Sequence, residues 1–227
     1  MNKLPNTLRS ILALALWLIS HAEAFAAAPD LIKEKKCDTC HRFAPDSPKP
    51  ASDGPNLFFA GDKFQKDWLA AYLQKPDIIR KAGHAGDPGF LQGQPALGNP
   101  HVSLSAEEAR ALADYLLTLK IPGPAFAVDM EPLSGGNKAK IKSLFERDYG
   151  CSACHETINL AGKIHGGISG PSLVDAGNRL NADWVFRQLK TPKEFLDKGR
   201  MPVFQLEDDV IVQLARYIMT MKKENLR

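Results

Sequence analysis

The sequence predicts an all-α protein of two tandem helical domains that follow an amino-terminal leader. Several segments carry apolar residues at helical spacing, whereas almost none alternates with a period of two. Several short sequence patterns of the first part of the chain occur again, in the same order, in the second part, which indicates an internal repeat. A stretch rich in proline and glycine separates the copies. We expect a leader (1–27), a first domain (28–121), a linker (122–136) and a second domain (137–227).

The leader has the layout of a cleavable secretory signal. Lys3 and Arg9 precede an apolar run from Ile11 to Ile19, and small residues follow it. An uncleaved membrane anchor is the alternative, but this run is much shorter than the ~20 apolar residues that cross a bilayer. We therefore expect export to the periplasm, cleavage, and no membrane span in the rest of the chain.

The charge of the chain does not indicate a nucleic-acid-binding protein. The formal net charge is +3, and it falls to about +2 when Lys3, Arg9 and Glu23 leave with the leader. A nucleic-acid-binding face would need a much larger basic excess. Four cysteines in an exported chain would ordinarily form two disulfides, but their spacing indicates another use.

The cysteines lie in two copies of the pattern Cys-x-x-Cys-His, which is typical of c-type haem attachment. Two thiols one helical turn apart can each form a thioether with the same porphyrin edge. The residue that follows can then turn its imidazole toward the iron. We expect two covalently bound haems with these attachment and proximal residues: Cys37, Cys40 and His41 in CDTCH, and Cys151, Cys154 and His155 in CSACH.

A Cys-x-x-Cys pair has two other common uses, in a zinc site and in a redox-active dithiol. A zinc site built from both pairs gives no reason for a histidine to follow each pair directly. A redox-active dithiol would need a strand followed by a helix. The segments before the two pairs, residues 30–36 and 138–150, instead have the pattern of short amphipathic helices. The repeated pattern therefore favours haem.

The helices that follow the motifs are also predicted in pairs. Residues 68–76 and 184–192 carry apolar residues at helical spacing, and each segment ends at a proline. Ser105 and Glu108 have the spacing of a capping box at the start of a helix that runs to about residue 120. Residues 207–223 are acidic at the start and basic at the end, as the helix dipole favours.

Each copy resembles a class I cytochrome c domain. The resemblance is carried by CxxCH, by GPNL (54–57) and GPSL (170–173), by the helices that begin at Trp68 and Trp184, and by a terminal helix. The whole chain is similar to the periplasmic two-domain dihaem cytochromes c. The resemblance implies one haem in each domain, with both tryptophans packed in the core against the haems. It also implies that their indole N–H groups are available to a haem propionate.

The resemblance implies that Met201, in GRMP, is the distal iron ligand of haem 2. The matching residue of the first domain is Asn99, and that domain contains no methionine. An insertion of 14 residues in the same region holds His84, and His101 lies two positions past Asn99. We expect His101 or His84 to be the distal ligand of haem 1. An open or water-bound iron is the remaining alternative.

The resemblance implies a carrier that transfers single electrons between redox proteins, with no catalytic residue. Its partners would be a donor and an acceptor, such as a periplasmic dehydrogenase or a membrane oxidase or reductase complex. Basic side chains of the second domain would steer an acidic partner. The alternative is a dihaem oxidoreductase or ligand sensor with an open or unusual haem 1, similar to peroxidases or sulfur-compound dehydrogenases. The sequence offers no evident acid–base pair for a peroxidase and no spare cysteine ligand for a sulfur-compound dehydrogenase.

Overall fold

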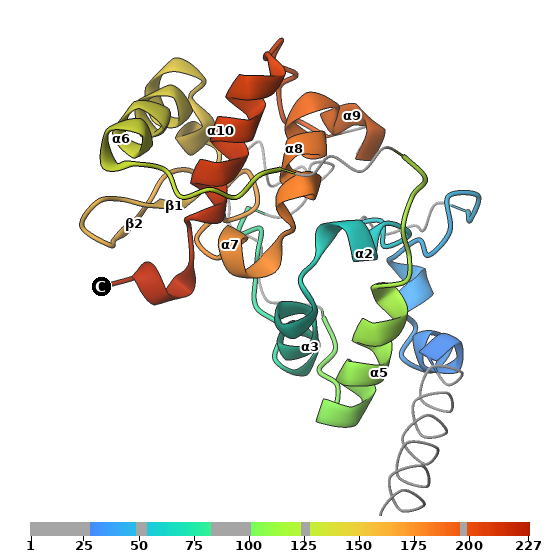
Figure 1. Cartoon of the computed structure of the whole chain (residues 1–227). Coiled ribbons are helices and arrows are strands. Elements are labelled where there is room, and N and C mark those ends of the chain that lie inside the picture. Colours follow the sequence, from blue (N-terminus) through green and yellow to red (C-terminus); the bar gives the residue numbers. More distant parts are fainter. Residues whose placement is uncertain (1–27, 49–53, 83–100, 124–127, 196–198) are drawn as a thin grey trace, which may run out of the picture.

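The computed structural model describes residues 28–48, 54–82, 101–123, 128–195 and 199–227. We call residues 28–121 half one and residues 128–227 half two. Half one contains a helical segment over 28–34, the 3₁₀ turn η1 (Cys37–Thr39), α2 (Ala60–Lys63), α3 (Lys66–Gln74) and α5 (Ala106–Leu116). In Figure 1 these elements lie together at the lower right of half two, with α2 at about the height of α7. The predicted signal, residues 1–27, lies outside the described residues.

Half two repeats this order of helices and adds a small hairpin. Its helices are α6 (Gly135–Ser143), the π turn η2 (Leu144–Asp148), the 3₁₀ turn η3 (Cys151–Ala153), α7 (Ala176–Arg179), α8 (Ala182–Lys190), α9 (Pro192–Phe195), α10 (Asp208–Met219) and the 3₁₀ turn η4 (Lys223–Asn225). Strands β1 (Thr157–Ile158) and β2 (Ile164–His165) pair antiparallel, with Thr157 opposite His165. The described residues are thus mostly helical, as predicted.

Local signals in the sequence explain where the last helix of half one begins. The Ser105 side chain accepts a hydrogen bond from the Glu108 backbone N–H, and the Glu108 carboxylate accepts one from the Ser105 backbone N–H at 2.8 Å. The predicted capping box is therefore confirmed. The face that α5 then buries is formed by Ala109, Leu112, Ala113 and Leu116.

The terminal helix of each half packs in the same way. Helix α5 lies against α3, and α10 lies against α8. The Gly61 N–H donates to the Leu119 carbonyl oxygen at 2.8 Å, and the Gly177 N–H donates to the Met221 carbonyl oxygen at 2.8 Å. A Cβ atom at either glycine would lie about 2 Å from a backbone oxygen of the terminal segment. Both contacts therefore require glycine.

The two halves join through residues at equivalent positions of the repeat, 116 residues apart. Phe64 and Leu180 form an antiparallel β-bridge. On one side of the bridge the Gln65 N–H donates to the Arg179 carbonyl oxygen, and on the other the Asn181 N–H donates to the Lys63 carbonyl oxygen, both at 2.9 Å. The junction thus has an approximate two-fold relation.

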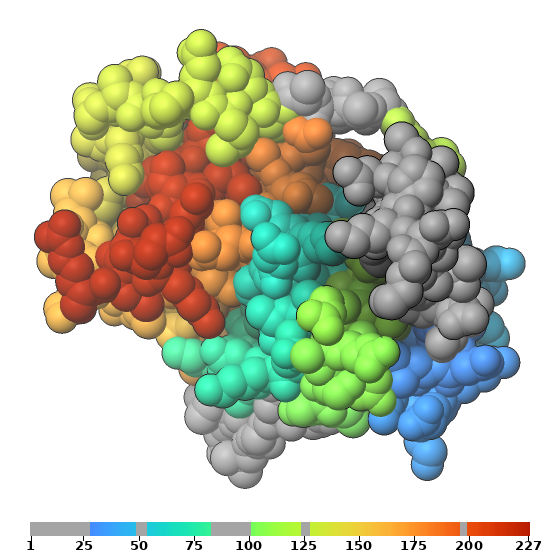
Figure 2. Space-filling view, turned by 60° about the horizontal axis from the view of Figure 1, so that its bottom comes forward, coloured from blue at the N-terminus to red at the C-terminus, as the bar shows by residue number. Residues whose placement is uncertain are grey.

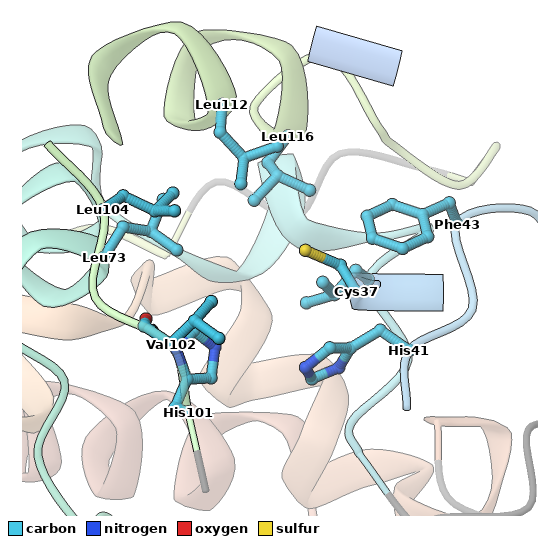
Figure 3. A pocket seen from close by; sticks show the side chains of 10 residues that line it. Cys37, His41, Phe43, Leu73, His101, Val102, Leu104, Leu112 and Leu116 are labelled. Carbon is cyan, nitrogen blue, oxygen red and sulfur yellow. Dashed lines mark hydrogen bonds between the residues drawn. The ribbon is translucent and has the colours of Figure 1, made fainter. Parts of the chain in front are cut away.

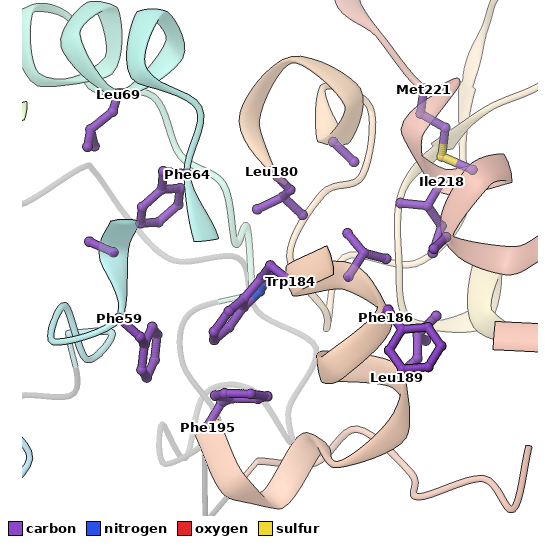
Figure 4. Close-up of a cluster of buried hydrophobic side chains, with 14 of the residues drawn as sticks. Phe59, Phe64, Leu69, Leu180, Trp184, Phe186, Leu189, Phe195, Ile218 and Met221 are labelled. Carbon is purple, nitrogen blue, oxygen red and sulfur yellow. The ribbon is translucent and has the colours of Figure 1, made fainter. Parts of the chain in front are cut away.

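Side chains at this junction form one continuous hydrophobic core across both halves. The Phe59 ring stacks on Trp184 with a centroid distance of 4.7 Å, and Phe195 of half two meets both rings (Figure 4). Trp184 is 3% exposed. In the space-filling view the teal segment of half one lies directly against the orange and red segments of half two (Figure 2). Apolar burial therefore holds the halves together.

Within the described part of the chain, no helix is both long enough and apolar enough to cross a membrane.

Candidate functional site

The motif of half one forms a single tight turn. After the helical segment 28–34, Lys36 takes a left-handed conformation (φ 55°) and starts the 3₁₀ turn at Cys37. The backbone N–H groups of Cys40 and His41 both donate to the Cys37 carbonyl oxygen, at 3.1 Å and 2.9 Å. The turn therefore holds two thiols and an imidazole within one short segment.

A hydrogen bond to the GPNL segment fixes the orientation of the His41 ring. Its Nδ1–H donates to the Pro55 carbonyl oxygen at 2.7 Å. A Cβ atom at Gly54 would lie 2.5 Å from the Cys40 carbonyl oxygen and 2.8 Å from His41 Nδ1, so only glycine permits this approach. Burial lowers the pKa of His41, which favours the neutral imidazole. With Nδ1 protonated, Nε2 is the nitrogen that can bind a metal.

An apolar cavity adjoins these groups and contains a second histidine (Figure 3). The ring of His101 lies opposite that of His41, with a centroid distance of 6.1 Å and an interplanar angle of 57°. The Nδ1–H of His101 donates to the Val102 carbonyl oxygen at 3.0 Å, so Nε2 is again the nitrogen that can bind a metal. The remaining walls are formed by Cys37, Phe43, Leu57, Leu73, Leu104, Leu112 and Leu116.

The motif of half two has the same local geometry. Gly150 takes the left-handed conformation (φ 61°), and the His155 N–H donates to the Cys151 carbonyl oxygen at 3.1 Å. His155 Nδ1–H donates to the Pro171 carbonyl oxygen at 2.7 Å. Burial lowers the pKa of His155 and raises the pKa of the Cys151 thiol to about 11. Gly170 is the counterpart of Gly54, because a Cβ there would lie 2.5 Å from the His155 ring.

No disulfide joins any two of the four cysteines. The zinc alternative would require the two pairs to meet in one cluster. Among the described residues, no group of three or more His, Cys, Asp or Glu side chains is placed to hold a metal ion.

Comparison with known proteins finds one family model, which covers the first of the two motifs. The family model described as Cytochrome c matches residues 25–120. This match supports a cytochrome c domain. The domain contains Cys37, Cys40 and His41, and it extends past His101. No curated protein and no solved structure matches the chain significantly.

A cytochrome c domain implies covalently bound haem c, and the residues of the domain fit that group. The motif supplies two thiols on one turn and a neutral imidazole whose Nδ1 is held by a backbone oxygen. The cavity beside them has apolar walls and a second imidazole. These are the donor groups and the dry surroundings that a haem iron and its porphyrin require.

Of the other residues considered as distal ligands, the structure describes Met201. Met201 is partly buried and packs against the hydrophobic core, and the Gln188 amide lies 4.0 Å from its sulfur. His84 and Asn99 lie outside the described residues. The structure places His101 beside the cytochrome c motif.

The structure corrects the expectation that the indole N–H groups of both tryptophans are available to a haem propionate. The indole N–H of Trp68 donates to the Asp175 carboxylate of half two at 2.9 Å, so it is already engaged and is not available to a propionate. Trp184 stacks on Phe59 of half one. Both rings thus contribute to the junction between the halves. A single copy of the motif could not reveal this role, because the partners lie more than 100 residues away along the chain.

Proposed function

We propose that this chain is a dihaem c-type cytochrome that transfers single electrons between redox proteins. The observation that carries the proposal is the repeated turn, in which two thiols precede a histidine whose Nδ1–H donates to a proline carbonyl oxygen. This arrangement occurs at His41 inside the cytochrome c domain and again at His155. The bond lengths to the two proline oxygens are equal, 2.7 Å. The second motif therefore has the same means of orienting a ligand as the first.

For haem 1 we propose thioethers to Cys37 and Cys40, with His41 and His101 as axial ligands. Two imidazoles that bind one metal ion at about 2.0–2.1 Å each have ring centroids roughly 6 Å apart. The centroid distance of 6.1 Å between His41 and His101 agrees with this spacing. Each histidine uses Nδ1 for a backbone carbonyl, so both would bind through Nε2. This geometry supports His101 as the distal ligand.

For haem 2 we propose thioethers to Cys151 and Cys154, with His155 and Met201 as axial ligands. The packing of Met201 against the core supports a fixed position for its sulfur. A thioether ligand favours ferrous iron more than an imidazole does, so haem 2 should have the higher potential. Unequal ligation would thus give the electron a preferred direction between the two halves.

The haem itself supplies the change between ferric and ferrous iron. The chain holds His41 and His155 in place through their Nδ1 contacts, and leucine and phenylalanine side chains of half one would cover haem 1. Burial lowers the pKa of both proximal histidines, which favours the neutral imidazole that a metal can bind. Filled axial positions on both irons would leave no site for a small substrate, which suits a carrier.

We further propose that the carrier is exported to the periplasm and that its signal, residues 1–27, is removed. The donor and acceptor would be other redox proteins, such as a periplasmic dehydrogenase or a membrane oxidase or reductase complex. Some basic side chains of half two are neutralised internally, because Lys190 pairs with Asp208 and Arg187 pairs with Glu194. Partner binding should therefore depend only weakly on ionic strength.

The test is the haem content and the spin state of the protein purified from a host that attaches c-type haem. Intact mass and pyridine haemochrome absorbance should give two covalent haems per chain. Electron paramagnetic resonance of the oxidised protein should show two low-spin ferric signals. One haem per chain would overturn the dihaem proposal. A substantial high-spin signal would overturn the carrier and favour an enzyme or a ligand sensor.

A further inference from the structure

A stack of aromatic rings runs from the junction between the halves to His101. The Phe64 ring stacks on Trp68 with a centroid distance of 5.4 Å, and Trp68 stacks on Tyr72 at 4.8 Å. The edge of the Tyr72 pair is completed by His101, with centroids 5.3 Å apart and an interplanar angle of 64°. Trp68 and Tyr72 are four residues apart on α3, so they lie on one face of that helix. The stack therefore connects the β-bridge at Phe64 to the cavity of half one.

Side chains of half two hold the central ring of this stack. The indole N–H of Trp68 donates at 2.9 Å to the carboxylate of Asp175, a residue that is 8% exposed. A hydrogen bond to an ionised acceptor is stronger than one between neutral groups. The Arg179 guanidinium of half two also lies 5.8 Å from the centroid of the Trp68 ring. Rotation of the indole would break its hydrogen bond, so half two determines how the Trp68 ring is oriented.

His101 lies on a loop, and α3 provides the contacts that place this loop. The hydrogen bond from His101 Nδ1–H goes to Val102 of the same loop, so that bond does not tie the ring to another element. The Leu104 N–H donates to the Leu73 carbonyl oxygen at 2.9 Å, and the two leucine side chains lie side by side in Figure 3. Leu73 directly follows Tyr72, so the backbone contact and the ring contact both come from the end of α3. The position of His101 therefore depends on how α3 and its rings are held.

The residues of the stack differ between the two copies of the repeat. At the positions of half two that are equivalent to Phe64 and Tyr72, the sequence has Leu180 and Gln188. The position of half one that is equivalent to Asp175 is Phe59, which has no carboxylate. The equivalent positions therefore cannot form the same stack around the proposed ligand of haem 2. Any effect of the stack should be confined to haem 1.

We propose that Asp175 and Trp68 are positioning residues for His101, so that half two determines how the distal ligand of haem 1 is held. This inference rests on the proposed ligation of haem 1 by His41 and His101. Asp175 acts through Trp68, and Trp68 acts through Tyr72 on the imidazole. With the stack in place, the plane of the His101 ring is fixed and the ligand dissociates slowly. Without the hydrogen bond to Asp175, the rings can turn and His101 loses its packing on one side.

The test compares Asp175→Ala and Trp68→Phe with the matched control Gln65→Ala, in the protein loaded with both haems. Trp68→Phe keeps an aromatic ring and removes the N–H group. Gln65→Ala removes hydrogen bonds to Gly177 and Leu180 across the same junction and leaves the donor and acceptor of the Trp68–Asp175 bond in place. These three variants therefore separate the loss of one particular hydrogen bond from a general weakening of the junction.

Two measurements on the oxidised protein report on His101. The rate of cyanide binding depends on how readily the distal ligand dissociates, and the phase of haem 1 is the one that His101→Ala accelerates. Asp175→Ala and Trp68→Phe should each accelerate this phase by about threefold or more, as the loss of one hydrogen bond allows. The g values of haem 1 in electron paramagnetic resonance depend on the angle between the planes of its two imidazoles, and they should shift in the same variants. Asp175→Asn keeps an oxygen acceptor and should restore most of both properties, while Gln65→Ala should match the wild type.

The outcomes separate this inference from the function on which it rests. Two low-spin haems in the wild type, with unchanged cyanide rates and g values in Asp175→Ala and Trp68→Phe, would overturn the positioning role and leave the carrier intact. Equal effects in Gln65→Ala would also overturn it, because any weakening of the junction would then be sufficient. A wild type in which His101 does not bind haem 1 would overturn the inference together with the proposed ligation. If Asp175→Ala fails to accumulate, Trp68→Phe decides the question alone.

Discussion

The imidazole rings of His41 and His101 face each other across the cavity of half one, with centroids 6.1 Å apart. They come from opposite ends of the cytochrome c domain, and each uses Nδ1 for a backbone carbonyl oxygen. This relation makes the spin state of haem 1 a direct test of His101. The replacement His101→Ala should convert a large part of one ferric signal from low spin to high spin, while the signal of haem 2 is unchanged. The measurement is electron paramagnetic resonance of the oxidised protein.

The matched control for His101 is His84→Ala, because His84 is the other histidine that the sequence offers as a ligand. It should leave both low-spin signals in place. If His84→Ala instead produces the high-spin signal and His101→Ala does not, then His84 is the ligand and the proposed pairing of His41 with His101 is wrong.

Replacing Met201 tests the proposed ligation of haem 2. Met201→His exchanges a soft thioether for an imidazole, which favours the ferric form. The iron should remain low spin, while the potential of haem 2 falls well below that of the wild type and approaches that of haem 1. A potentiometric titration followed optically gives both values. Replacement of Met130, a methionine that is 47% exposed, by His should change neither potential. Equal effects of the two substitutions would contradict a ligand role for Met201.

The close contacts of Gly61 and Gly177 predict a large and local loss of stability on adding one methyl group. At Gly61 the new Cβ would lie 2.0 Å from the Leu117 carbonyl oxygen, so α2 and the end of α5 must separate. Gly61→Ala should lower the free energy of unfolding by about 1–3 kcal/mol, and Gly177→Ala by a similar amount. Gly136→Ala is the control, because nothing lies within 4 Å of its Cβ position. It should be neutral or stabilising by about 0.4–1 kcal/mol. Denaturant titration of the haem-loaded protein measures all three.

The hydrogen bonds of the Gln65 side chain allow a test of how much the junction between the halves stabilises the protein. Its side-chain amide donates to the carbonyl oxygens of Gly177 and Leu180, at 3.1 Å and 2.6 Å. Gln65→Ala leaves these two oxygens without that donor and should cost about 1–3 kcal/mol of unfolding free energy. Gln74→Ala removes an amide that reaches only the Ala70 carbonyl oxygen of its own helix, so its effect should stay within about 0.5 kcal/mol. A similar loss in both variants would mean that the junction contributes little.

Much of the local structure could be predicted from the sequence because local chemistry determines it. The capping box at Ser105 and the helices over 66–74 and 182–190 follow from side-chain spacing and from proline. The hairpin of Thr157–Ile158 and Ile164–His165 could not be predicted in this way. Strands of two residues are too short to show an alternating pattern.

The candidate site could also be predicted only in part from the sequence. The spacing of CDTCH and CSACH identifies thiols and imidazoles that one turn brings together. The choice between His84 and His101 depends on a fold that returns a distant loop to His41, and spacing alone left both open. The hydrogen bond from Trp68 to Asp175 could not be predicted from the sequence, because it forms between the halves and not within one of them.

The bridge between Phe64 and Leu180 has a consequence for the origin of the molecule. A contact in which equivalent residues meet is isologous, and isologous contacts are the kind that form between identical subunits of a two-fold dimer. Within one polypeptide, the second partner of such a contact is always present at a high effective concentration. Each side is then able to change alone, as Lys63 differs from Arg179 and Phe59 from Asp175. A self-pairing homodimer cannot acquire such differences, because any substitution in it appears on both sides at once.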